Sequence, residues 1–273
     1  MWTPSSCSAV LCVLDEAEII EDSLESLLNL GLKEVIVVDG GSTDGTLSIL
    51  KTKKKIRVLS LPNQGLLRQR IAGIASAKSA FVLLVDADDK IEVKELEENL
   101  AILKKEPSLD GVQFRLRSPN RNFWERGWTT YFGILTRPGE SIKLLGRPSI
   151  AKTTNFANLP DAPVNIFGED TWIHFQEKGL GRKYKTGPGF STRSCPSDIF
   201  SNFRQFKRYG KTDCELATTP GEHFNLLFHA GIRIAFFRSW RALFQGSLSG
   251  FVFTFLLGQT RAVQHYKQWL FGE

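Results

Sequence analysis

Three carboxylates gather at one point of the chain, directly after an apolar run. Every residue from Phe81 to Val85 is apolar, which is typical of a strand buried on both faces of a parallel sheet. Asp86, Asp88 and Asp89 follow, and because Asp favours turns and strand ends, we expect them at the carboxyl edge of that sheet. A hard divalent cation would relieve their mutual repulsion. We therefore predict a metal site at Asp86 and Asp88, and interpret Asp89 as the N-cap of the next helix.

A second acidic pair, Glu169-Asp170, follows Gly168 at the start of a helix expected over residues 171–178. Acidic residues in a first turn commonly compensate the helix dipole. A carboxylate in a cleft can also accept a proton from a reacting group. These residues alone leave both interpretations open.

A glycine-rich turn covers residues 39–46, between a Val-rich strand and a helix for which Thr43 or Asp44 is the expected cap. Such a turn exposes backbone N–H groups and can approach a nucleotide closely. It is neither GxGxxG nor a Walker loop, so by itself it is only a weak indication of nucleotide binding.

The composition sets broad limits. With 42% hydrophobic and 23% charged residues the chain is globular rather than disordered, and its 273 residues suffice for one large core or a core with an appendage. The net charge of +6 favours ligands that bear phosphate, anionic lipid or nucleic acid.

The four cysteines, Cys7, Cys12, Cys195 and Cys214, are scattered without a CxxC spacing, which disfavours a zinc site. The first residues do not resemble a signal peptide, so we expect reduced thiols in the cytosol. No apolar run reaches the roughly 20 residues of a membrane-spanning helix.

The elements that position these residues alternate between strand and helix as far as residue 105. Strands are expected at residues 8–14, 34–38, 56–61 and 81–85, and helices at 17–30, 66–77 and 92–105. This order predicts an α/β fold with a mostly parallel sheet and helices on both faces. Residues 111–117 alternate like an antiparallel or edge strand. The aromatic stretch 120–145 is interpreted either as a mobile loop over the substrate or as aromatics packed on the sheet.

The end of the chain alternates apolar and cationic residues. Residues 224–237 and 250–257 are apolar, and Arg233, Arg238 and Arg241 lie between them. Both pieces could lie in a membrane interface with the arginines at headgroup level, or form helices packed on the core. We divide the chain into a catalytic domain over residues 1–200 and a helical region, partly apolar, over residues 201–273.

Taken together, several short motifs resemble the family-two nucleotide-sugar glycosyltransferases of the GT-A fold. The residues that carry this resemblance are Leu14-Asp15-Glu16, Val37 to Thr46, Asn63-Gln64-Gly65 with Arg70, Val85 to Asp89, and Gly168-Glu169-Asp170. The likeness covers about residues 8 to 195 in matching order and spacing.

The resemblance implies roles for individual residues. It assigns the donor site to Glu16, Asp39, Arg70 and Asp86, the first two on the nucleoside. Asp88 would be the principal ligand of Mg²⁺ or Mn²⁺, with Asp86 beside it, and Asp170 would be the general base. Many relatives also carry a metal-binding His near the position of Cys195, and this chain has none there.

The final part, with Gly246 to Phe251 and Tyr266 to Trp269, is similar to bacterial lipopolysaccharide-core and lipid-linked-saccharide transferases. The QxxRW signature of processive synthases is absent. The expected activity is therefore inverting transfer of one sugar from a nucleotide sugar, with a UDP-sugar as first choice, to a saccharide or lipid-linked acceptor. The expected place is the cytoplasmic face of a membrane, bound peripherally.

Two alternatives stay open. A phosphohydrolase also uses DxD, although normally after its first strand, whereas here the motif follows the fourth. A non-catalytic protein that binds nucleotides or anionic surfaces would fit the charge. No nucleic-acid-binding motif is present, so nucleic acid is not an expected partner.

Overall fold

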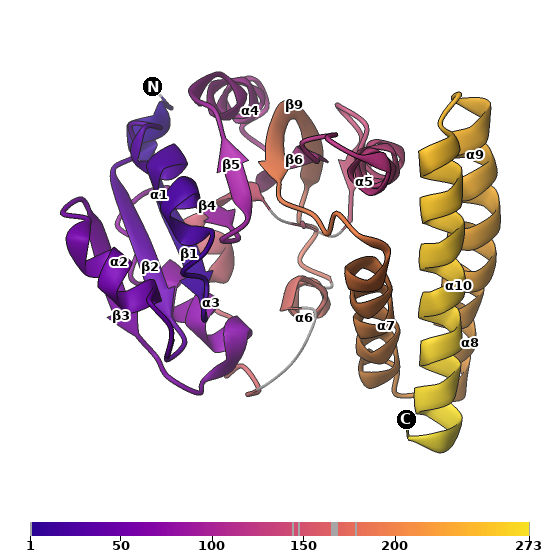
Figure 1. Cartoon of the computed structure of the whole chain (residues 1–273). Coiled ribbons are helices and arrows are strands. Elements are labelled where there is room, and N and C mark those ends of the chain that lie inside the picture. The colour runs from indigo at the N-terminus through magenta and orange to yellow at the C-terminus, as the bar shows by residue number, and fades with distance from the viewer. Residues whose placement is uncertain (1, 144, 147, 165–168, 178, 273) are drawn as a thin grey trace. The chain divides into compact units, whose positions relative to one another are not determined.

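The computed structural model describes residues 2–143, 145–146, 148–164, 169–177 and 179–272. The chain divides into two compact units (Figure 1). The sheet unit comprises Met1–Arg115 and Arg137–Arg193, and the helical unit comprises Leu116–Thr136 and Ser194–Glu273. The helical unit thus takes in residues 116–136 as well as the end of the chain, whereas the sequence divided the chain only near residue 200.

The first half of the sheet is parallel, as the alternating pattern predicts. Its strands are β1 (Cys7–Val13), β2 (Glu34–Asp39), β3 (Ile56–Ser60) and β4 (Phe81–Val85), in the spatial order β3-β2-β1-β4. The register pairs Val13 with Asp39 and Leu11 with Val85. The last residues of β1 and β2 therefore lie side by side, β4 ends two residues earlier opposite Leu11, and the loops that follow the three strands start at one edge.

The second half of the sheet is antiparallel. Beyond β4 come β8 (Ser149–Lys152), β6 (Gly111–Arg117), β9 (Tyr184–Arg193) and β5 (Asp89–Ile91), and β7 (Ser141–Ile142) pairs with β9. The expected strand at residues 111–117 is β6, and it pairs antiparallel with β8. It lies inside the sheet rather than at an edge.

Helices cover both faces of the parallel strands because alternate side chains of β1 are apolar on both sides. Ala9, Leu11 and Val13 join one core, to which α1 (Ile20–Leu28), α2 (Thr46–Thr52) and α4 (Val93–Lys105) contribute. Val10 and Cys12 join the opposite core, to which α3 (Gly65–Ala75) and α6 (Glu169–Gln176) contribute. Short 3₁₀ turns lie at Pro4–Ser6 and Thr153–Phe156.

The helical unit is built from α5 (Phe123–Leu135), α7 (Ile199–Leu216), α8 (Pro220–Phe228), the π-helical segment η3 (His229–Arg238), α9 (Ser239–Phe244) and α10 (Leu248–Phe271). Its core is aromatic. The Trp128 ring lies 4.7 Å from that of Phe253 and 5.3 Å from that of Phe132. A Cβ on Gly127 would come within 2.6 Å of Phe253, so glycine permits this close crossing of α5 and α10.

The aromatic stretch thus corrects one expectation. Residues 123–135 form α5, and its rings pack within the helical unit instead of forming a loop or lying on the sheet. Trp124, Trp128, Tyr131 and Leu135 recur at intervals of four, three and four residues, which is the spacing of one helix face. Among the helices described, none is both long and apolar enough to cross a membrane.

Candidate functional site

The loops after β1 and β2 are tied together at the carboxyl edge of the sheet. Asp15, which has a φ of 55°, accepts hydrogen bonds from the N–H groups of Thr43 at 2.7 Å and Asp44 at 3.3 Å. In return the N–H of Asp15 donates to Ser42 Oγ and that of Glu16 to Thr46 Oγ1. The two loops therefore form one rigid rim beside the sheet edge.

Asp39 shapes the glycine-rich turn from within. Its side chain is fully buried, and its two oxygens accept the N–H groups of Gly41 at 3.0 Å and Ser42 at 3.2 Å. Gly41 has a φ of +99° and would bring a Cβ within 3.0 Å of Pro62, so this tight turn requires glycine. The helix that follows starts at Thr46 with Gly45 as N-cap rather than Thr43 or Asp44, although the Asp44 carboxylate accepts the Thr46 N–H at 2.8 Å.

Glu16 lies near the acids of two other loops. Burial raises its pKa, and the neighbouring carboxylates of Asp44, Asp86 and Asp15 raise it further. Because the charges of both Asp44 and Asp86 act on Glu16, its carboxyl group lies where the loops after β1, β2 and β4 come together. Sequence reasoning placed Glu16, Asp39 and Asp86 in one donor site, and the structure gathers them at one edge.

Arg70 on α3 binds the Asp86 carboxylate. The Arg70 side chain is only 1% exposed, and its Nη2 donates to Asp86 Oδ1 at 2.9 Å. Its Nη1 donates to the carbonyl of Val85 at 3.4 Å. Arg70 therefore fixes the end of β4 and the carboxylate that follows it, which is a positioning role beneath the sheet edge.

Arg193, the last residue of β9, joins all three acids. Its Nη2 donates to Asp86 Oδ2 at 2.9 Å and to Asp89 Oδ2 at 2.7 Å, and its Nε lies 3.6 Å from Asp88 Oδ1. Although burial opposes its charge, the Asp89, Asp88 and Asp86 carboxylates raise the pKa of Arg193 well above its ordinary value. Sequence reasoning missed this residue, because no local pattern links it to a motif more than 100 positions earlier.

Asp89 is not the N-cap of the following helix. It is the first residue of β5, and the N-cap of α4 is Glu92. Its buried side chain accepts from the N–H of Asp86 at 3.1 Å and from Ser191 Oγ at 3.1 Å, besides Arg193. Pairing of β5 with β9 overrode the local capping preference, so Asp89 holds the acidic turn in shape.

Asp88 is the acid of this cluster that has a carboxylate oxygen without a hydrogen bond among the described residues. This oxygen, Oδ1, is buried. Burial, with the Asp89 and Asp86 carboxylates, raises the pKa of Asp88 to about 7 against the opposing effect of Arg193. One carboxylate oxygen each from Asp86, Asp88 and Asp89 lies within 4.8 Å of the others. These residues fit a hard divalent ion with Asp88 as principal ligand, but Arg193 already neutralises part of their charge.

Asp170 lies near the start of α6, on the same side of the sheet as Arg70. It lines a narrow cavity with Leu84, Glu177 and Tyr184. Ile173, one turn later, packs in the same apolar core as Leu84, which is the second-to-last residue of β4. Gly168 lies outside the described residues. The fold thus brings Asp170 toward the carboxyl edge of β4.

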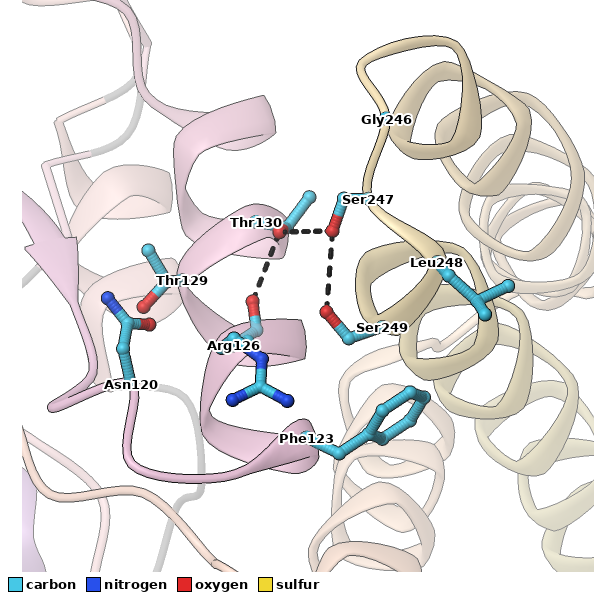
Figure 2. A pocket seen from close by; sticks show the side chains of 9 residues that line it. All are labelled: Asn120, Phe123, Arg126, Thr129, Thr130, Gly246, Ser247, Leu248 and Ser249. Carbon is cyan, nitrogen blue, oxygen red and sulfur yellow. Dashed lines mark hydrogen bonds between the residues drawn. The ribbon is translucent and has the colours of Figure 1, made fainter.

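The helical unit contains a separate groove of about 560 Å³. Figure 2 shows Arg126 of α5 beside the serines that open α10. Thr130 Oγ1 and Ser247 Oγ lie 2.9 Å apart, and Ser247 caps α10 by accepting the Gly250 N–H. Asn120, Phe123 and Ser249 complete much of the lining. Hydroxyls and a guanidinium suit the hydroxyl groups of a saccharide or the charge of a phosphate.

Comparison with known proteins identifies the class of this chain. Residues 8–162 match the family described as glycosyl transferase family 2, which is more than half of the chain. The chain therefore belongs to glycosyl transferase family 2, a family of transferase enzymes.

Two curated relatives resemble part of the chain. It is 32% identical over 96 residues to the cholesterol galactosyltransferase of Borreliella burgdorferi, a match that covers 33% of this chain and 27% of that protein. It is 31% identical over 121 residues to the poly-beta-1,6-N-acetyl-D-glucosamine synthase of Staphylococcus epidermidis, which covers 42% and 29%. The match spans less than a third of the length of either relative.

Solved structures share the fold. A mannosyltransferase from Pyrobaculum calidifontis, in complex with GDP-Man and Mn²⁺, matches with a TM-score of 0.63 and 16% identity over 97% of this chain and 88% of that chain. S. aureus TarS in complex with UDP-GlcNAc matches with a TM-score of 0.55 and 15% identity over 96% and 87%. At these identities the likeness concerns the fold alone, and it confirms the predicted GT-A class.

Proposed function

We propose that this chain transfers one sugar from a nucleotide-sugar donor to a saccharide or lipid-linked acceptor, with inversion at the anomeric carbon. The observation that carries the proposal is the convergence of three acidic loops, after β1, β2 and β4, at one sheet edge in a member of glycosyl transferase family 2. Open α/β sheets bind their ligands at this edge.

The donor would lie against the rim formed by the first two loops. The carboxylate of Glu16 would meet the nucleoside, while buried Asp39 keeps the glycine turn in shape. A UDP-sugar is our first choice, because TarS has been solved with UDP-GlcNAc. The structure from Pyrobaculum calidifontis contains GDP-Man, so the identity of the donor's nucleobase is the first property to test.

Asp88 and Asp86 would hold Mg²⁺ or Mn²⁺ beside the diphosphate. When bound, this ion would stabilise the negative charge that develops on the leaving diphosphate. Support comes from Asp88 Oδ1, which has no hydrogen bond among the described residues, and from the Mn²⁺ in the Pyrobaculum calidifontis enzyme. Arg70 would keep Asp86 in place, and Arg193 would balance the acids when no donor is bound.

Asp170 would act as the general base on the acceptor. The acceptor oxygen would attack the anomeric carbon while the bond to the diphosphate breaks, and the hydroxyl proton would pass to the Asp170 carboxylate. A single base that accepts the proton of the acceptor hydroxyl favours a single displacement, which inverts configuration. The position of Asp170 beside Leu84, near the end of β4, is compatible with this role.

A panel of nucleotide sugars tests the proposal directly. With Mn²⁺ present, a donor at a hundred times its Kd should stabilise the protein by about 2.7 kcal/mol, and nucleoside diphosphate should be released when a lipid-linked acceptor is added. Cleavage of simple phosphate esters, with no stabilisation by any nucleotide sugar, would instead favour the DxD phosphohydrolase. Stabilisation without turnover for any acceptor would favour a non-catalytic nucleotide-binding protein.

A second proposal concerns peripheral contact with the cytoplasmic face of a membrane. The helical unit exposes an aromatic face, which we define as Phe224, Phe228, Phe236, Phe237, Trp240, Phe244 and Phe255. Phe244 is 84% exposed. Four of these residues are neighbours: the ring centroid of Trp240 lies 6.3 Å from that of Phe236 and 6.2 Å from that of Phe244, and Phe237 adjoins Phe236. Exposed apolar surface of this kind marks interaction sites.

The charges beside the aromatic face favour an anionic bilayer as its partner. Arg233 is exposed and its guanidinium lies 5.7 Å from the centre of the Phe228 ring. Arg238 and Arg241 follow on the same helical run. Basic residues near an anionic surface contribute about 1 kcal/mol each, and aromatic rings bury well at headgroup depth. A lipid-linked acceptor would be present in the same membrane.

A further inference from the structure

Three helices of the helical unit bring one thiol and two imidazoles to a single point. Cys214 is near the end of α7, His223 is on α8 and His265 is on α10. The Cys214 sulfur and one ring nitrogen of each histidine lie within 4.8 Å of one another. His265 is fully buried, His223 is 8% exposed and Cys214 is half-buried.

The two imidazoles face each other edge to edge. His223 Nδ1 lies 2.9 Å from His265 Nε2, and the ring planes are 80° apart. The His223 ring is stacked on that of Trp269, with centroids 4.4 Å apart and planes 10° apart. The two nitrogen atoms are hydrogen-bonded to each other next to the Cys214 sulfur, and a metal ion would replace the proton that they share.

The imidazole pair is not fully satisfied by hydrogen bonds. His265 Nδ1, the other nitrogen of that ring, is buried without a hydrogen-bond partner among the described residues, and buried atoms of this kind are rare enough to need an explanation. Asp213, which precedes Cys214, is engaged by Arg261 at 2.6 Å. The two histidines are therefore buried with fewer hydrogen bonds than their nitrogen atoms can make.

We propose that Cys214, His223 and His265 bind one Zn²⁺ ion. Tetrahedral zinc takes sulfur at about 2.3 Å and nitrogen at about 2.0–2.1 Å, which puts ligand atoms about 3.4–3.6 Å apart. The observed separations require a small opening of the histidine pair and rotation of the half-buried Cys214. On binding, the Cys214 thiol releases its proton to solvent, and both imidazoles bind in the neutral form with their proton on the other nitrogen.

Such a site would join the consecutive helices α7 and α8 to α10, which lies more distant in the sequence. Three protein ligands leave the fourth position to water. The histidines are 42 residues apart, so no short sequence motif contains the site. The search for a CxxC spacing among the cysteines could not find it.

Cobalt is the sharpest probe, because a thiolate–Co²⁺ bond gives a near-ultraviolet charge-transfer band that oxygen ligands do not give. The full chain, stripped with a chelator, should develop this band with saturation at one Co²⁺ per chain, and Zn²⁺ should abolish it. Cys214→Ser should remove the band. Cys195→Ser, at another half-buried thiol of the helical unit, and Asp88→Asn, at the acidic cluster, should both keep it.

A second measurement covers the case in which Cys214→Ser does not fold. In the parent protein, Zn²⁺ should slow alkylation of Cys214 at least tenfold and leave Cys195 unchanged, as mapped by mass spectrometry. His223→Gln should reverse this protection. Absence of the cobalt band in folded parent protein, its persistence in Cys214→Ser, or equal alkylation of Cys214 with and without Zn²⁺ would each overturn the proposal.

Discussion

Arg193, the last residue of β9, forms a bidentate ion pair with Asp89, the first residue of β5: Nε donates to Oδ1 at 3.0 Å and Nη2 to Oδ2 at 2.7 Å. The Asp89 side chain is 0% exposed and that of Arg193 is 20% exposed. Water therefore screens this pair little, and the same guanidinium reaches Asp86. The acidic turn after β4 is thus built around an internal cation.

Arg193→Gln should destabilise the sheet unit, because three carboxylates would lose their shared counter-charge. Removing one partner of a buried pair costs about 3–5 kcal/mol, and the partial exposure of Arg193 puts our expectation at about 2–4 kcal/mol. Urea unfolding measures the change. Lys90→Gln is the matched control, because its bond to Asp22 is exposed and such pairs contribute about 0–1 kcal/mol.

The acidic cluster also makes a prediction about Mn²⁺. Asp88→Asn should leave the fold intact and abolish Mn²⁺-dependent stabilisation by a nucleotide sugar, because an amide in place of the Asp88 carboxylate carries no charge for the ion. Thermal unfolding with and without Mn²⁺, at fixed nucleotide sugar, checks this. Unchanged metal dependence in this variant would show that Asp88 is not the ligand.

Asp170→Asn should separate chemistry from donor binding. The amide keeps the shape of the side chain but cannot accept the acceptor proton, and loss of a general base typically lowers the rate by about 10²- to 10⁴-fold. Diphosphate release in the presence of acceptor measures turnover, and thermal shift measures donor binding. Near-normal turnover, or loss of donor affinity instead, would contradict the assigned role.

His229 should make the helical unit sensitive to mild acid. Burial lowers its pKa to about 4, with help from Arg238, Arg261 and Arg233 and against Asp213. Because the folded-state pKa lies below the unfolded value of about 6.5, its contribution to stability is complete above pH 6.5. It is lost progressively as the pH falls toward 4, by at most about 3 kcal/mol. His229→Gln should flatten the pH profile of unfolding in this window, and a parallel profile would exclude His229 as its cause.

Binding to anionic vesicles should depend on both the rings and the arginines of the aromatic face. Phe244→Ser and the triple change of Arg233, Arg238 and Arg241 to Gln should each weaken flotation with vesicles, and high salt should weaken only the electrostatic part. Phe200→Ser is a control, since this ring is 78% exposed outside the aromatic face. If the parent protein does not float at low salt, the proposal of membrane contact fails.

Sequence reasoning worked best for segments whose residue types alone indicate a buried strand. The parallel strands came from short apolar runs bounded by turn residues, and the acids after β4 fell at the predicted edge because Asp is depleted in strands and favours their ends. The aromatic helix α5 was missed because Gly127 and Gly133 interrupt its pattern. In the sequence both glycines indicate a loop. The structure explains Gly127, because Phe253 approaches it too closely for a side chain.

The site itself was only partly predictable. Loop acids such as Asp86 follow from local sequence, whereas Arg193 and the pairing of β5 with β9 arise from contacts between distant segments. That pairing made the capping prediction for Asp89 wrong. The buried position of Asp39 was equally hidden, because a strand-end acid can point to solvent or into its own turn.

The hydrogen bonds that connect Asp15 to Thr43 and Glu16 to Thr46 have a kinetic consequence. A pocket wall that is already ordered has little conformational entropy left to lose when a ligand arrives. Association of the nucleoside part should therefore be governed by diffusion and charge rather than by loop rearrangement. Selection among nucleotides would then be expressed mainly in how long each one stays bound.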